Sequence, residues 1–215
     1  MNGKKVFRYT ETGMAWKNDN DVGIQHVYPV GQIGLGSDPD LLQTGLNTLL
    51  EMNRWDDYNA FSTFFTAAAR LGHDSGEILS HLNEELRKHA FTNMYIYYGG
   101  GGIECCSGVP ACVNEMLLQS HEGVLRLFPV WNPARDAAFY QLRAYGAFLV
   151  SAMISGGRIH DVNILSEKGR QCIVRDIFGG AASVYDATQG APVEHRMENG
   201  NIVFNTLPSH VYKIG

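Results

Sequence analysis

The amino-acid sequence predicts an α+β protein of more than one domain, with a helical first part followed by a part made of antiparallel strands. Two observations predict it. Apolar residues recur at helical spacing in the first half of the chain, whereas from about residue 124 short apolar runs alternate with turn signals. The boundary is expected near residue 123, so that a helical segment covers residues 1–123 and a β domain covers residues 124–215. With 215 residues, of which 45% are hydrophobic, the chain can bury one good core or two modest ones.

Three helices joined by short connections are expected before residue 90. Ser37 can cap the first, whose opening turn is Asp38-Pro39-Asp40. The second is expected from Asp57 to Gly72, because a glycine suits the left-handed residue that often follows a helix. The third should begin near Asp74 or the serine after it. Since the connections are only a few residues long, the three helices should be antiparallel neighbours.

The glycine run Gly99–Gly102 interrupts the helical pattern. The aromatic run Tyr95–Tyr98 before it is predicted to be a strand or an extended loop. After it, Pro110 suits the first turn of a fourth helix, which should end near Gly123. No Lys-Ser or Lys-Thr pair follows the glycines, which argues against a phosphate-binding loop. A close approach of the backbone to a ligand or to a neighbouring helix explains the glycines better.

The second half of the sequence is typical of an antiparallel β-sandwich, because its apolar runs are short and are separated by turn signals such as Ser155-Gly156-Gly157. Seven runs are predicted to be strands: Val124–Phe128, Ala147–Val150, Ile159–Leu165, Gln171–Val174, Ala182–Tyr185, Ile202–Phe204 and Val211–Ile214.

The composition argues against several classes of partner. The net charge of -5 and the pI near 5.9 provide no basic surface for nucleic acid. No apolar run approaches the roughly 18 residues that a membrane-spanning helix needs, and the basic N-terminus lacks the apolar run of a signal peptide. The histidines show no metal-ligand spacing, so neither a metal nor a cofactor is expected. The cysteines are expected to be reduced thiols: Cys105, Cys106, Cys112 and Cys172.

Glu104 is the first candidate for a catalytic carboxylate. It follows the glycine run, lies among Ile103, Cys105 and Cys106, and precedes an expected helix start. A carboxylate held in such a setting can act as a general base when its neighbours fix its protonation and geometry. The alternative is a solvated loop glutamate.

His26 is a candidate for lining a sugar pocket, since it lies beside Val27-Tyr28-Pro29 and a glycine-rich segment. The alternative is a loop histidine that is hydrogen-bonded to the backbone. Aromatic residues are frequent, and their faces are good platforms for sugar rings, although core packing explains them equally well. The residues alone therefore leave open a glycan enzyme and a glycan-binding module.

Three groups of segments together resemble the C-terminal third of glycoside hydrolase family 95, whose members include bacterial α-L-fucosidases and α-L-galactosidases. The similarity covers roughly residues 24 to 165. The first group runs through His26–Pro29, Asp38–Leu42 and Asn47–Leu49; the second is Ala68–Gly72; the third and most specific is Glu115–Gly123 with Leu127–Pro129 and Leu142–Phe148.

This resemblance implies a fold and a mechanism. The helical part would be a portion of an (α/α)6 toroid, followed by an antiparallel β-sandwich-like domain. Family members hydrolyse the glycosidic bond with inversion, which requires one carboxylic acid and one carboxylate about 6.5–9.5 Å apart. The family's general-base aspartate, in its Asp-Gly-Asn-Phe-Gly-Gly motif, corresponds to Glu104. Cys106 and Ser107 replace the motif's Asn and Phe. Cys106 therefore joins His26 as a candidate substrate-binding residue.

The resemblance also implies what the chain lacks and where relatives act. The family's general acid lies upstream of the matching segments, so the chain alone is expected to be inactive on its glycan substrate. A toroid that is cut open would expose apolar helix faces, which predicts self-association. Intact relatives are expected to be periplasmic or secreted. The alternative is a non-catalytic glycan-binding or structural module.

Overall fold

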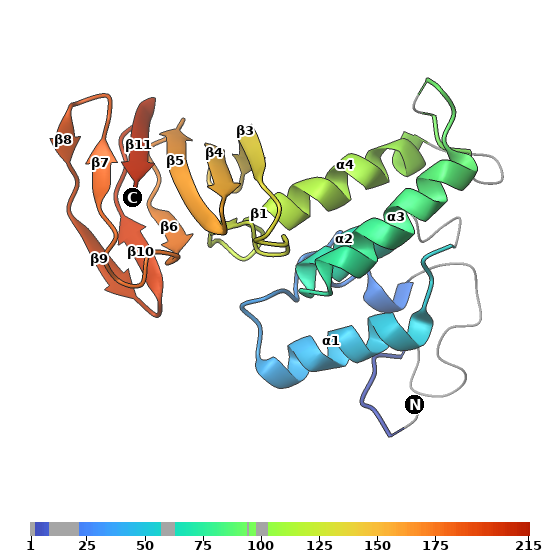
Figure 1. Ribbon diagram of the computed structural model, residues 1–215. Helices are drawn as coiled ribbons and strands as arrows, with labels where there is room; N and C mark the ends of the chain where they lie inside the picture. Colours follow the sequence, from blue (N-terminus) through green and yellow to red (C-terminus); the bar gives the residue numbers. More distant parts are fainter. Residues whose placement is uncertain (1–2, 9–21, 57–62, 94, 98–102) are drawn as a thin grey trace. The chain divides into compact units, whose positions relative to one another are not determined.

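The computed structural model describes residues 3–8, 22–56, 63–93, 95–97 and 103–215 (Figure 1). Within these ranges it contains four α-helices and antiparallel β-sheets, which confirms the predicted α+β class. The chain divides into two compact units, Met1–Met116 and Leu117–Gly215. The first unit is helical and the second is built from strands, in the predicted order. The second unit starts ahead of residue 123 because its first strand begins at Leu118.

Aspartate side chains cap two helices of the first unit. The elements here are the 3-10 helix η1 (Val22–Ile24) and the helices α1 (Pro39–Met52), α2 (Phe64–Arg70), α3 (Ser75–His89) and α4 (Ile103–Leu117). Asp74 caps α3, as predicted, by accepting a hydrogen bond from the Glu77 amide at 2.8 Å. Asp38 caps α1 in place of the predicted Ser37, and it accepts from the Asp40 amide at 3.0 Å. A carboxylate at this position also places negative charge at the positive end of the helix.

The predicted second helix lies only partly among the described residues. α2 begins at Phe64, and residues 57–62 are outside the description. It ends at Arg70, and Gly72 has the left-handed φ of +75° that the sequence predicted. Every residue of α2 is buried, and the helix contacts both α1 and α3. α2 is therefore the central helix of the described part of this unit.

The fourth helix starts earlier than predicted. α4 begins at Ile103, and Pro110 lies in its interior rather than in its first turn. A proline has no amide hydrogen, so the Cys106 carbonyl loses its helical donor. Pro110 is exposed, which lets water reach this side of the helix. The helix ends at Leu117 and not near Gly123, because the chain then enters a strand pairing.

The aromatic run that precedes α4 is described only in part. Ile96 is buried and forms an antiparallel bridge with Ala90, directly after α3. An extended conformation is therefore confirmed around Ile96. Tyr98 and the glycine run Gly99–Gly102 lie outside the described residues.

The second unit contains three antiparallel sheets in its described residues. β1 pairs with β2; β6, β10 and β9 form a three-stranded sheet in that order; the third sheet has the order β3-β4-β5-β11-β7-β8 (Figure 1). The strands are β1 (Leu118–Gln119), β2 (Arg126–Leu127), β3 (Ala137–Ala144), β4 (Phe148–Ser155), β5 (Arg158–Ser166), β6 (Cys172–Arg175), β7 (Val184–Asp186), β8 (Ala191–Pro192), β9 (His195–Glu198), β10 (Asn201–Phe204) and β11 (His210–Ile214).

All seven predicted runs contain strand residues, but the sequence missed four strands, β1, β3, β8 and β9, of which β3 and β9 are longer than two residues. β3, with the sequence Ala-Ala-Phe-Tyr-Gln-Leu-Arg-Ala, has no β-branched residue, and β9 is His-Arg-Met-Glu. Each is extended because a neighbouring strand supplies its hydrogen bonds, β4 for β3 and β10 for β9. Strand propensity reflects such surroundings more than the residues themselves.

The core of the second unit lies where the two larger sheets meet. Phe204 from β10 and Tyr212 from β11 have ring centroids 5.5 Å apart, and both side chains are almost completely buried. β11 lies between β5 and β7, so the last strand of the chain is in the middle of its sheet. Packing of this kind joins the two sheets through apolar side chains.

Among the described residues, no helix is long and apolar enough to cross a membrane.

Candidate functional site

Glu104 lies in the first turn of α4, where its side chain is exposed to solvent. Its backbone carbonyl accepts a hydrogen bond from the Ser107 hydroxyl at 2.9 Å. The expected apolar setting holds for the next residue, Cys105, which is buried, but not for Glu104 itself. A negative charge in a first helical turn is favourable in the helix dipole. Other parts of the protein would have to enclose this carboxylate before it could act as a base.

The cysteines are free thiols with different surroundings. Cys106, the substrate-binding candidate, is half-buried. Cys112, two helical turns later, is fully buried, and its thiol donates to the Phe65 carbonyl at 3.5 Å. Burial raises the pKa of Cys112 to about 12, with a further contribution from the Glu115 carboxylate, so this thiol is protonated and inert at neutral pH.

His26 is half-buried in the segment after η1. Its ring packs edge-on against Phe7, with centroids 4.3 Å apart. Nε2 is buried and has no hydrogen-bond partner among the residues that the structure describes. Burial lowers the pKa of His26, because the charged ring would lose its hydration. The side chain is thus a neutral ring in an apolar contact, and the predicted backbone hydrogen bond is not found for the ring nitrogen Nε2.

His26 and Glu104 lie near different ends of α4. The residue after His26, Val27, is linked through Arg70 to Glu115. Glu115 lies about 16 Å beyond Glu104 along the helix axis, at about 1.5 Å per residue. The His26 segment therefore lies beside the last turns of α4, whereas Glu104 and Cys106 lie near its start.

Arg70 is the polar centre of the first unit, and the sequence did not single it out. Its side chain is almost completely buried at the end of α2. Nη1 donates to the Val27 carbonyl at 3.1 Å and Nη2 donates to Glu115 Oε1 at 2.7 Å. The guanidinium carbon lies 4.8 Å from the centre of the Tyr28 ring. One cation thus joins three segments that are far apart in the sequence.

A signal for this centre was present in the sequence. Arg70 ends the run Phe-Phe-Thr-Ala-Ala-Ala, in which every residue is apolar or small. A charged residue on a helix without a polar face must be buried, and a buried arginine requires a carboxylate or carbonyl partner. The sequence could not identify Glu115 as that partner, because the pairing depends on how α2 and α4 pack.

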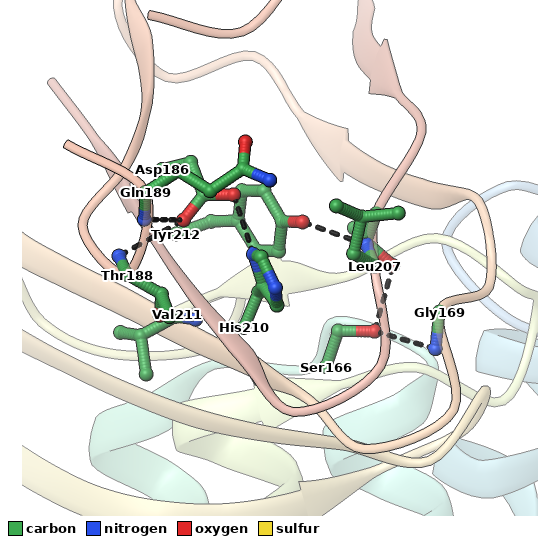
Figure 2. Close-up of polar contacts among 10 residues, drawn as sticks. Ser166, Gly169, Asp186, Thr188, Gln189, Leu207, His210, Val211 and Tyr212 are labelled. Atoms are coloured by element: carbon green, nitrogen blue, oxygen red, sulfur yellow. Dashed lines mark hydrogen bonds and ion pairs between the residues drawn. The ribbon is translucent and has the colours of Figure 1, made fainter. Parts of the chain in front are cut away.

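A second polar cluster, in the β unit, centres on Asp186 at the end of β7 (Figure 2). Asp186 is buried, and its Oδ2 lies 2.7 Å from Nδ1 of His210 on β11. Its Oδ1 accepts from the amides of Thr188 and Gln189 at 2.9 and 3.0 Å. Burial by itself raises the pKa of Asp186, but the hydrogen bonds from His210, Gln189 and Thr188 outweigh it and hold the pKa below its ordinary value.

The hydroxyl groups near this cluster bond to loop residues, and the Tyr212 hydroxyl also interacts with the Asp186 carboxylate. Ser166 Oγ lies 2.6 Å from Thr206 Oγ1 and accepts from the Gly169 amide at 3.1 Å. Tyr212 Oη accepts from the Leu207 amide at 2.7 Å (Figure 2). Ser166 is therefore committed to a loop that it orders, and the arrangement is not that of a nucleophile activated by His210. The cluster ties the turn after β7 to β11.

Acid should destabilise the β unit through Asp186. Because the folded pKa is below the ordinary value, the stabilisation is present at neutral pH and is lost as the pH falls through the folded pKa. We expect Asp186→Asn to be less stable than the native chain at neutral pH, and to lose less stability between pH 5 and about pH 2. The measurement is thermal unfolding followed by the far-ultraviolet signal of the strands.

Asp161→Asn is the matched control for this experiment, since Asp161 also pairs with a histidine, His160, at 2.9 Å but is exposed. Its acid dependence should match the native chain. Equal acid dependence of Asp186→Asn and the native chain would contradict the assignment.

Among the residues that the structure describes, no three or more His, Cys, Asp or Glu side chains are grouped so that they could hold a metal ion.

Comparison with known protein families and curated proteins finds no relative of this chain. No protein-family model matches the chain, and no curated protein matches it either.

Proposed function

We propose that this chain is the C-terminal portion of an inverting glycoside hydrolase that resembles family 95, with Glu104 as general base and a glycan as substrate. In this proposal α1 to α4 belong to an (α/α)6 toroid, and the two larger sheets of the second unit form a sandwich. Glu104 would remove a proton from the water that attacks the anomeric carbon, while an acid from elsewhere in the protein protonates the leaving oxygen. His26 and Cys106 remain the proposed substrate-binding residues.

One observation carries the proposal: Arg70 joins residues from all three groups of segments on which the resemblance rests. Val27 and Tyr28 belong to the first segment, Arg70 to the second and Glu115 to the third. Their convergence on one buried cation supports the proposal, because a buried ion pair fails when either partner is lost and an ancestral packing around it would therefore be retained.

The test uses the whole reading frame that contains this chain. Glu104→Gln should reduce hydrolysis of an α-L-fucosyl glycan by about 10²- to 10⁴-fold, since the amide cannot accept the proton. The readout is the anomer that is released first, followed by NMR, which also shows inversion. Glu84→Gln is the control, because Glu84 is an exposed carboxylate on α3. Unchanged hydrolysis by Glu104→Gln would disprove the base assignment.

The second candidate is a non-catalytic glycan-binding module. The exposure of Glu104 favours this second candidate. Active sites commonly exclude bulk water, whereas the Glu104 carboxylate is open to solvent. A binding module has no hydrolysis rate that Glu104→Gln could reduce, and its glycan affinity should stay unchanged. Self-association through exposed helix faces stays a prediction under either candidate.

A further inference from the structure

A groove in the β unit, distant in sequence from Glu104, has the size and chemistry of a ligand site. It has a volume of about 440 Å³ and lies along β9 and β10, where its lining includes Glu194, His195, Arg196 and Asn205. Small-molecule sites commonly have volumes of about 300–1,000 Å³. The groove therefore has room for one or two sugar rings, but not for a folded partner.

The hydrogen bonds at the groove fix what two of its side chains offer. His195 Nδ1 lies 3.3 Å from the Val193 carbonyl, which can only accept, so Nδ1 carries the hydrogen and Nε2 is an acceptor when the ring is neutral. Asn205 Oδ1 accepts from Gln171 Nε2 at 3.3 Å, which leaves the Asn205 amide hydrogens as donors. An acceptor and a donor thus occur among the residues that line the same groove, and sugar hydroxyl groups can both donate and accept.

The charges favour a neutral ligand. Arg196 is the cation of the groove, but its Nε donates to Glu198 at 3.0 Å. Glu194 is the carboxylate of the groove lining. Because Glu198 beside the groove already pairs with Arg196, the Glu194 carboxylate leaves an excess negative charge, which repels phosphates, sulfates and acidic sugars. Carboxylates and amides are good partners for the hydroxyl groups of neutral sugars.

The groove also provides apolar surface, and it lies at a strand edge where pairing with a peptide strand is unfavourable. Val193 is half-buried in its lining and can contact the C–H face of a sugar ring, whereas Val203 is almost completely buried. β9 is at the edge of its sheet and carries Arg196 and Glu198. Charged side chains on an edge strand disfavour the addition of another strand.

We propose that the groove along β9 and β10 is a non-catalytic binding site for a neutral sugar of a glycan. The ligand class rests on the proposed function, which makes glycans the substrate. The site deepens that function: it would hold a glycan on the β unit, separately from any reaction at Glu104.

The experiment measures binding of a neutral fucosylated lactose trisaccharide to the full chain by saturation-transfer NMR and calorimetry. Glu194→Gln and Asn205→Ala each remove one polar contact from an exposed position, so both variants should fold. We expect each to weaken binding by about three- to ten-fold, the range for losing one hydrogen bond. Galacturonate, an anionic probe, should bind more weakly than its neutral counterpart galactose.

Two control variants separate this site from other sites. Glu84→Gln, at an exposed carboxylate on α3, should leave the affinity unchanged, and so should Tyr140→Ser, which removes an aromatic side chain that is 72% exposed on β3. No binding by the native chain at millimolar sugar would overturn the groove site, and so would native affinity in both groove variants. Loss of binding only in Glu104→Gln would also overturn it while supporting a sugar site at Glu104. Hydrolysis by the whole protein is a separate readout, so the two proposals can fail independently.

Discussion

Arg70→Ala should lower the free energy of unfolding of the helical unit by about 3–5 kcal/mol, the usual effect of removing one partner of a buried ion pair. The substitution removes the donor to the Val27 carbonyl at 3.1 Å and the cation that pairs with Glu115 at 2.7 Å. It also removes the cation over the Tyr28 ring. Urea unfolding followed by the helical circular dichroism signal measures the change.

One further variant at Arg70 shows how much of this effect depends on charge and how much on geometry. Arg70→Lys keeps the charge but has no planar fork, so it cannot serve the Val27 carbonyl and Glu115 together, and it should lie between the native chain and Arg70→Ala. Arg158→Ala is the control, because Arg158 is exposed at the start of β5, and its effect should stay within about 0.5 kcal/mol. A stability loss at Arg70 no larger than that at Arg158 would disprove the central role of Arg70.

Local signals in the sequence predicted the elements whose ends are set by local contacts. α3 begins after Asp74 as predicted, because its cap requires only residues within one helical turn. Gly72 likewise has the predicted left-handed conformation. These features depend on the chemistry of neighbouring residues, which a sequence displays directly.

Tertiary context decided the elements that the sequence missed. Pro110 marks a helix start by propensity, yet α4 continues through it from Ile103. Propensity is a weak guide where packing fixes the backbone. β9 has no apolar alternation, and β10 alone makes it a strand.

The candidate sites show the same limit. Glu104 was selected from its position after the glycine run and from the family motif, but its exposure depends on which face of α4 packs inward. The sequence predicted an apolar setting, which Cys105 has and Glu104 does not. Asp186 and His210 were not selected, since 24 residues separate them and only the β7–β11 pairing brings them together. The sequence supplied the groups, and the fold decided which of them meet.

Tyr212→Ala should lower the free energy of unfolding of the β unit by about 3–5 kcal/mol, as for other large aromatic side chains that are removed from a core. Tyr212 is 1% exposed, lies on a central strand and packs against Phe204 of the neighbouring sheet. Removing its ring leaves a cavity where the two sheets meet. Thermal and urea unfolding, followed by the near-ultraviolet aromatic signal, measure the loss.

Tyr212→Phe separates the hydroxyl from the ring. The ring contact with Phe204 is kept, but the Leu207 amide loses its acceptor and Asp186 loses a hydroxyl neighbour, so the loss should be about 1 kcal/mol. Tyr140→Ala, at a tyrosine that is 72% exposed, should change the stability by less than about 0.5 kcal/mol. A loss in Tyr212→Phe equal to that in Tyr212→Ala would mean that the hydrogen bond, and not the packing, holds the sheets together. Because Tyr212 Oη accepts from the loop between β10 and β11 while its ring lies in the core, the ratio of the two losses measures how strongly that loop is coupled to the sheets.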